Sequence, residues 1–141
     1  MKRLSIIIVS IIFIACFTSC CKDLCLKEQL HLYFIGFDRL DLDTIDTKIY
    51  EPSSNFTQQV DSQRMIYGLE TMDTTPVTLS MNVQLDKDIA IVLPSTAQQY
   101  QLTDFQTKRE PCGCGQGDRK IVTAYMQDGT PRTGTEIYLH K

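Results

Sequence analysis

Apolar and polar residues alternate along much of this chain in short runs, a pattern typical of half-buried β-strands. The longest run lies at 77–85, where five apolar residues from Val77 to Leu85 occupy every second position, with polar residues between them. It predicts an antiparallel strand with one face in a core. Residues 89–93 are apolar on both faces and are followed by Pro94, so they predict a strand near the centre of a sheet.

Shorter runs predict further strands at 30–35, 44–51, 64–69, 100–105, 120–126 and 135–140. The apolar spacing slips between Leu102 and Phe105, which suggests a bulge. Residues 56–60 fit no element clearly, 109–118 predict a loop, and Asp128-Gly129 predicts the start of a turn. Seven or eight strands predict an all-β antiparallel sandwich of immunoglobulin-like or transthyretin-like type. Such a fold carries no particular function.

The first residues have a different character. Met1-Lys2-Arg3 precedes an uncharged, very apolar stretch at 4–17, which is typical of a secretory signal peptide. The stretch is shorter than the ~20 residues needed to cross a bilayer. A buried helix and a retained, uncleaved anchor are the alternatives.

Phe17-Thr18-Ser19-Cys20 resembles a lipobox, the motif in which bacterial lipoproteins are acylated on the cysteine and cleaved immediately before it. The resemblance implies that Cys20 becomes the lipid-bearing N-terminus; Cys16, after Phe13-Ile14-Ala15, is the alternative. It also implies a signal peptide at 1–19, a short tether at 20–29 and one domain at 30–141. The protein as a whole resembles small Bacteroidetes-type β-sandwich lipoproteins of unknown function. Its expected location is the bacterial cell envelope, lipid-anchored in the outer membrane and facing either the periplasm or the cell surface.

Charge and length narrow the range of partners. Cleavage after residue 19 leaves 122 of the 141 residues, enough for one domain. This part carries all 17 acidic residues. It carries 12 of the 14 basic residues, because Lys2 and Arg3 are removed, and its net charge is therefore about −5. Such a balance argues against nucleic acid and against an electrostatic grip on anionic lipid.

Four cysteines remain once Cys20 is acylated. Cys21 and Cys25 lie at the start of the mature chain, and Cys112 and Cys114 lie near its end. An even set in an oxidising compartment predicts disulfides, with at least one bridge between the two pairs. Such a bridge would stabilise the fold by ~4 kcal/mol. Zinc binding by four thiolates and a redox role for Cys112-Gly113-Cys114 are the alternatives.

No catalytic motif is evident. His31 is expected to be an ordinary sheet residue, and His140 lies too close to the C-terminus for a well-held general base. Four acidic residues at 38–46 suggest calcium ligands, but the EF-hand pattern fails because Ile45 occupies a ligand position. The expectation is therefore a protein that is not an enzyme and has neither a metal site nor a cofactor.

Two short patterns indicate modification. Asp43-Thr44-Ile45 and Asp73-Thr74-Thr75 match the Asp-Ser/Thr pattern of Bacteroidetes-type secretory O-glycosylation, which makes Thr44 and Thr74 candidate sites. Asn55-Phe56-Thr57 matches an N-glycosylation sequon, whose use is not expected behind a bacterial leader.

These observations favour a membrane-anchored, non-enzymatic lipoprotein whose β-sandwich binds a protein or glycan partner. One alternative is a thiol-disulfide or metal-handling lipoprotein that uses Cys112 and Cys114. The other is a structural subunit of an envelope assembly.

Overall fold

The computed structural model describes residues 25–66, 77–113 and 116–141. Within these ranges the chain forms nine β-strands and no helix, so the predicted all-β sandwich is confirmed, with more strands than the seven or eight expected. The strands are β1 (Gln29–Ile35), β2 (Thr44–Tyr50), β3 (Gln59–Ile66), β4 (Val77–Asn82), β5 (Asp88–Leu93), β6 (Gln98–Pro111), β7 (Asp118–Gln127), β8 (Thr130–Thr133) and β9 (Glu136–His140).

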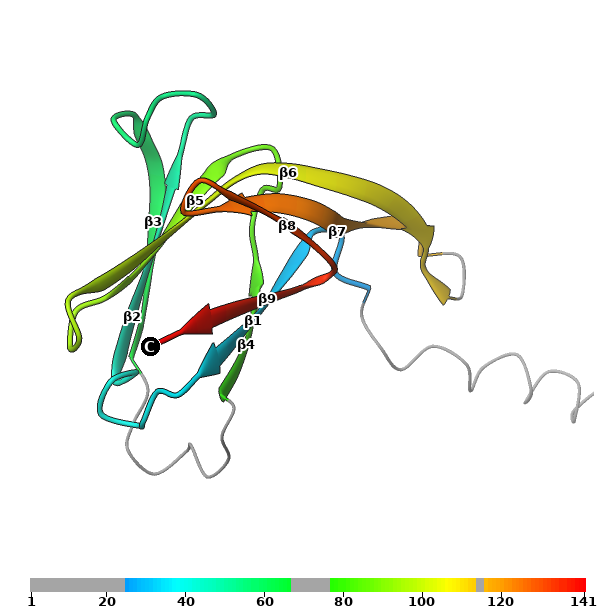
Figure 1. Ribbon diagram of the computed structural model, residues 1–141. Helices are drawn as coiled ribbons and strands as arrows, with labels where there is room; N and C mark the ends of the chain where they lie inside the picture. Colours follow the sequence, from blue (N-terminus) through cyan, green and yellow to red (C-terminus); the bar gives the residue numbers. More distant parts are fainter. Residues whose placement is uncertain (1–24, 67–76, 114–115) are drawn as a thin grey trace, which may run out of the picture.

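The strands form two sheets (Figure 1). The smaller has the order β4-β1-β9 and the larger the order β3-β2-β5-β6-β7-β8. Neighbours are antiparallel except β1 and β9, which run parallel. An immunoglobulin sandwich places its first, second, fifth and fourth strands together in one sheet. Here β1 pairs with β4 and lies in a different sheet from β2 and β5, so the immunoglobulin order is not found; the transthyretin-like alternative stays a prediction.

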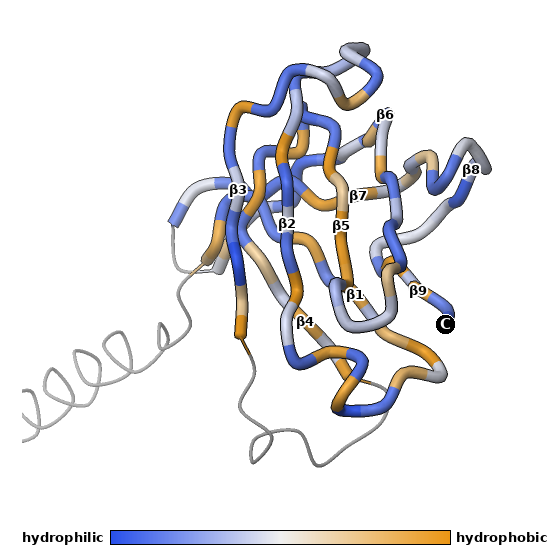
Figure 2. Tube along the Cα trace, turned by 90° about the vertical axis from the view of Figure 1, so that its left-hand side faces the viewer, coloured by the Kyte–Doolittle hydropathy of each residue, from blue (hydrophilic) through white to orange (hydrophobic). Residues whose placement is uncertain are grey.

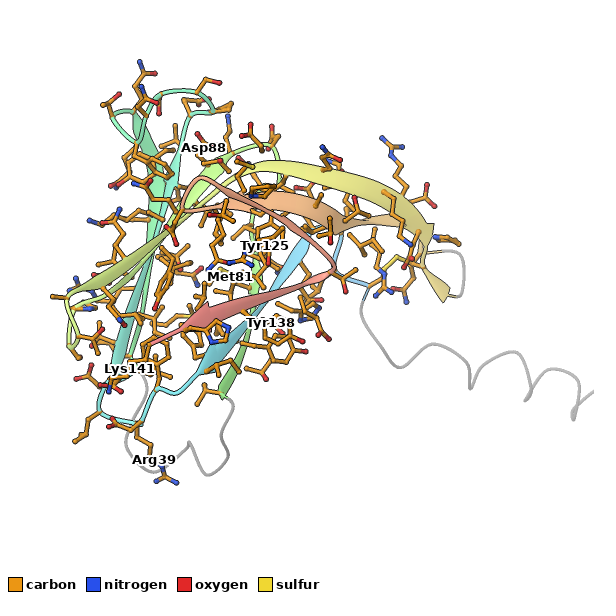
Figure 3. All side chains as sticks on the ribbon, in the orientation of Figure 1. Arg39, Met81, Asp88, Tyr125, Tyr138 and Lys141 are labelled. Carbon is orange, nitrogen blue, oxygen red and sulfur yellow. A yellow bond between two sulfur atoms is a disulfide. The ribbon has the colours of Figure 1, made fainter. Side chains whose placement is uncertain are left out.

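The core follows directly from the alternation. Every second residue of β1 and β9 is buried, including Leu32, Phe34 and Ile137. Met81 of β4 lies between the sheets, where Figure 3 labels it. The opposing sheet contributes β5, which is almost continuously hydrophobic in Figure 2 and has Ile89 and Ile91 completely buried. The predicted central place of β5, between β2 and β6, is confirmed.

β6 and β7 extend much further than predicted. The loop expected at 109–118 is shortened because β6 continues to Pro111 and β7 begins at Asp118. The predicted bulge is present: the β6–β7 register shifts between Thr103 and Gln106, and Asp104 has a φ of 52°. We call the distal part of this hairpin the arm, comprising residues 108–111 and 118–121. Since the arm has no buried side chain, its sequence lacks the alternation that reveals a half-buried strand.

Two further strands differ from expectation because they are polar. β3 begins at Gln59 rather than at 64, and all but one of its residues are exposed. β8 lies where a turn running through Pro131 was expected, and all four of its residues are exposed. Neither strand buries a hydrophobic face, so pairing with a neighbouring strand determines both.

The outer edge of β9 is covered by side chains of the other sheet. The carbonyl of Glu136 accepts a hydrogen bond from the Tyr125 hydroxyl at 3.4 Å, and that of Tyr138 accepts one from Gln127 Nε2 at 3.3 Å. The His140 carbonyl accepts one from the Tyr100 hydroxyl. These bonds satisfy alternate carbonyls of an edge that would otherwise be open to another strand.

Candidate functional site

A disulfide joins the N-terminal end of the described chain to the far end of β6. Cys25 is bonded to Cys112, 87 positions away, with their Cα atoms 6.0 Å apart, a normal separation for a disulfide. The bond confirms the prediction of a bridge from the Cys21/Cys25 pair to the Cys112/Cys114 pair. The other four cysteines lie outside the described residues: Cys16, Cys20, Cys21 and Cys114.

Glu28, three residues after Cys25, also bonds the first described residues to the domain. Its carboxylate accepts hydrogen bonds from Lys120 Nζ at 2.6 Å and from the backbone N–H of Leu85 at 3.0 Å. The backbone N–H of Lys120 donates to the carbonyl of Lys27 at 2.7 Å. One carboxylate therefore joins the start of the chain to β7 and to the connection after β4.

We call Cys25, Glu28, Cys112 and Lys120 the clasp. Burial raises the pKa of Glu28, but the hydrogen bonds from Lys120 and Leu85, together with the charge of Lys120, hold it below its usual value. The ionised form is thus the one that the fold stabilises. Residues 25–29, expected to belong to a tether, are bonded to the domain.

A groove of about 780 Å³ lies beside the clasp. We call it the tether groove. Both apolar and polar side chains line it, as in many ligand sites. Its lining combines the segment before β1, the ends of β2, β3 and β4, and the chain after β4: Cys25, Leu26, Lys27, Glu28, Ile49, Val60, Asp61, Asn82, Val83 and Gln84.

The two carboxylates that line the groove are engaged within the domain, Glu28 within the clasp and Asp61 with the backbone N–H of Ser62 at 2.7 Å. The groove contains no histidine and no free cysteine, because Cys25 is bonded to Cys112. Sequence reasoning missed this site because its residues come from four separate segments, one of them the ambiguous stretch at 56–60.

A second cluster lies on the outer face of the smaller sheet. The rings of Tyr33 and Tyr138 stack with centroids 5.1 Å apart, and both hydroxyls donate to the carboxylate of Glu136. Figure 3 shows Tyr138 on this face. Burial and Glu136 raise the pKa of Tyr33, and the hydrogen bond to Glu136 raises that of Tyr138. Both phenols therefore stay protonated at neutral pH and fix the carboxylate between them.

The acidic residues at 38–46 do not converge on one point. Asp38 and Asp41 accept backbone N–H groups of their own turn, Asp43 accepts from the Ser95 hydroxyl, and Asp46 forms a bidentate pair with Arg64 at 2.6 and 2.8 Å. Over the described ranges, no group of three or more metal-binding side chains occurs. These carboxylates stabilise turns and strand pairs.

The remaining candidates are half-buried or exposed, or lie outside the described chain. His31 Nδ1 hydrogen-bonds to the Ser80 hydroxyl at 2.9 Å on the outer face of the smaller sheet, and His140 is exposed at the end of β9. Thr44 is half-buried at the first position of β2, whereas Thr74 lies outside the described residues. No helix in the described chain is long and apolar enough to cross a membrane.

The chain matches no family model, no curated protein and no solved structure in comparisons with known proteins.

Proposed function

We propose that this protein is a lipid-anchored, non-enzymatic β-sandwich of the bacterial envelope that binds a partner in the tether groove. The clasp is the observation that carries the proposal. It fixes Cys25, only five positions after the lipobox-like Cys20, to the folded domain. An acyl chain on Cys20 would therefore hold the groove next to the membrane.

Two features support binding over chemistry. The groove is lined by both apolar and polar side chains, and its two carboxylates are held in hydrogen bonds. While the Cys25–Cys112 bond is intact, the Cys112 sulfur can neither form a bond with Cys114 nor act as a thiolate metal ligand. This supports a structural bridge over the alternative chemistry of Cys112 and Cys114.

The anchor is tested on the full chain expressed in a bacterium that processes lipoproteins. We expect the intact mass to show loss of residues 1–19 and addition of acyl chains. Cys20→Ser should abolish acylation and release the protein from membranes, whereas the control Cys16→Ser should leave both unchanged. Acylation that survives Cys20→Ser would refute the assignment.

The groove is tested by isolating the acylated protein from native membranes and quantifying what is bound to it. Val60→Glu places a charge in the groove and is expected to remove a bound partner. Ile66→Glu is the matched control, because Ile66 lies on the same strand, is 76% exposed and does not line the groove. Equal recovery of the partner with both variants would exclude the groove.

A second candidate, a subunit of an envelope assembly, is favoured by β3. This eight-residue edge strand pairs only with β2 among the described strands, and nearly all of it is exposed. Such an edge can accept another strand. Ser62→Pro would block pairing at this edge; loss of an assembled form in cross-linking of native membranes would support this function, and unchanged assembly would exclude it.

A further inference from the structure

The arm projects from the sandwich on the side where the described chain begins (Figure 1). Its strands pair from Lys108 opposite Ile121 to Pro111 opposite Asp118. None of its side chains is buried, so the arm contributes little to the core. Packing in the core therefore does not explain why this exposed hairpin extends so far from the sandwich.

Charge is distributed unevenly between this end and the rest of the domain. The clasp, the arm and Lys27 together carry five cations against three carboxylates, whereas the other described residues carry six cations against eleven carboxylates. The net acidity of the protein therefore conceals a basic end. The charged residues of this end are Lys27, Lys108, Arg109, Arg119 and Lys120 with Glu28, Glu110 and Asp118.

Part of this positive charge is not neutralised within the domain. Glu28 pairs with Lys120, and Glu110 lies 3.1 Å from Lys108 and 3.3 Å from Arg119. Lys27 and Arg109 are both exposed, and the described residues offer neither of them an ion-pair partner. These two side chains are available for an external anion.

The proposed anchor places this end against a bilayer. Five residues from Cys20 to Cys25 span at most about 18 Å when fully extended. The disulfide then holds Cys112, the residue after the arm's first strand, 6.0 Å from Cys25 between Cα atoms. So short a connection allows the basic groups to come within about 10 Å of the headgroups, the range over which their charge is felt at ordinary salt.

We propose that the basic end formed by the arm and Lys27 is a membrane-docking surface that contacts anionic phospholipid headgroups. The domain then lies with its arm on the bilayer and its acidic remainder directed away. This inference rests on the proposed lipid anchor. It differs from the expectation drawn from net charge alone, because the distribution of charge, rather than its sum, determines which face meets the lipid.

Hydrogen exchange of the acylated full-length protein on vesicles tests the docking. The vesicles contain either phosphatidylcholine alone or phosphatidylcholine with phosphatidylglycerol. Backbone amides of the arm are expected to exchange about threefold or more slowly on the anionic vesicles, and the effect should disappear at high salt. Equal exchange on both vesicles, or protection that persists at high salt, would overturn the proposal.

The double variant Lys27→Glu with Arg109→Glu should abolish this protection. Arg132→Glu is the matched control. Arg132 is an exposed residue of β8, and it pairs with Tyr125 of β7, which lies outside the arm. Unchanged thermal unfolding verifies that the variants fold. Protection retained in the double variant would also refute the docking surface.

The two proposals fail in different ways. If the intact mass shows no acyl group, the anchor is wrong and so is the docking that depends on it. If the protein is acylated and bound to vesicles but the arm exchanges equally on both compositions, the anchor stands and only the docking surface is refuted.

Discussion

The two halves of the β6–β7 hairpin are held in place by different forces. In the half near the sandwich, Leu102 and Val122 are buried in the core. In the arm, no side chain is buried, and the links to the domain include the Cys25–Cys112 bond, the ion pair of Glu28 with Lys120 and the backbone hydrogen bond from Lys120 to Lys27. One continuous pair of strands therefore depends on apolar burial at one end and on covalent and ionic bonds at the other.

The comparison extends to the carboxyl groups. Glu28 in the clasp has a lowered pKa because its ionised form is paired with Lys120, despite its burial. Asp88, at the start of β5, is 7% exposed and has a raised pKa, mainly because burial disfavours its charge. Its carboxylate accepts a hydrogen bond from the backbone N–H of Ser53, at 3.1 Å. The clasp thus stabilises the ionised form of its carboxylate, Glu28, whereas the surroundings of Asp88 in the larger sheet disfavour the ionised form.

Removing the disulfide is expected to have the largest effect. The double variant Cys25→Ser with Cys112→Ser should lose about 4–5 kcal/mol of unfolding free energy in the chain-entropy model, because it opens a loop of 87 positions. Denaturant titration under oxidising conditions measures the loss. Cys114→Ser is the control and should keep the bridge. A loss below about 1 kcal/mol would show that the disulfide does not stabilise the fold by restricting the conformations of the unfolded chain.

A cavity in the core comes next. Ile91→Ala should cost about 3 kcal/mol, because Ile91 is fully buried in β5. The matched change in the arm, Ile121→Ala, should cost less than about 1 kcal/mol, since Ile121 is only half-buried. Equal losses in denaturant titrations of the two variants would contradict the division of the hairpin into a packed half and a linked half.

Glu28→Gln isolates the ionic part of the clasp. It should cost about 1–2 kcal/mol at neutral pH, because Lys120 loses its counter-charge. Since the folded pKa of Glu28 is lowered, its contribution is present above its usual value of 4.5 and is lost as pH falls through the folded pKa. The difference between variant and wild type should therefore vanish in acid. Glu110→Gln is the control: its carboxylate pairs with Lys108 and Arg119 on the solvent-facing arm, so its loss should change stability less than the loss of Glu28 does.

Asp88→Asn should have the smallest effect and the opposite sign. Because the folded pKa is raised, the contribution of Asp88 is complete below its ordinary value of 3.8 and is lost as pH rises through the folded pKa. The variant should therefore gain up to about 1 kcal/mol at neutral pH and nothing in acid. The amide oxygen can still accept the Ser53 N–H. A variant less stable than wild type at pH 7 would show that the charge has a favourable partner.

How much could be predicted depends on how each strand is stabilised. β1, β4, β5 and β9 bury regular faces, so their alternating or continuous apolar residues identified them. The arm, β3 and β8 bury little, and their polar sequences resemble loops. The tether groove and the stacked Tyr33–Tyr138 pair unite residues far apart in the chain, and no local pattern marks them.

The sequence by itself determined the all-β class, the central position of β5, the bulge in β6 and a bridge between the Cys21/Cys25 pair and the Cys112/Cys114 pair. These depend on local periodicity and on cysteine number. Only the tertiary structure decided that Cys25 bonds to Cys112, that β1 joins β4 and β9, and that Glu28 meets Lys120 beside a groove. The basic end was also hidden until folding, because net charge is a sum over the chain, whereas a surface depends on which charges the fold brings together.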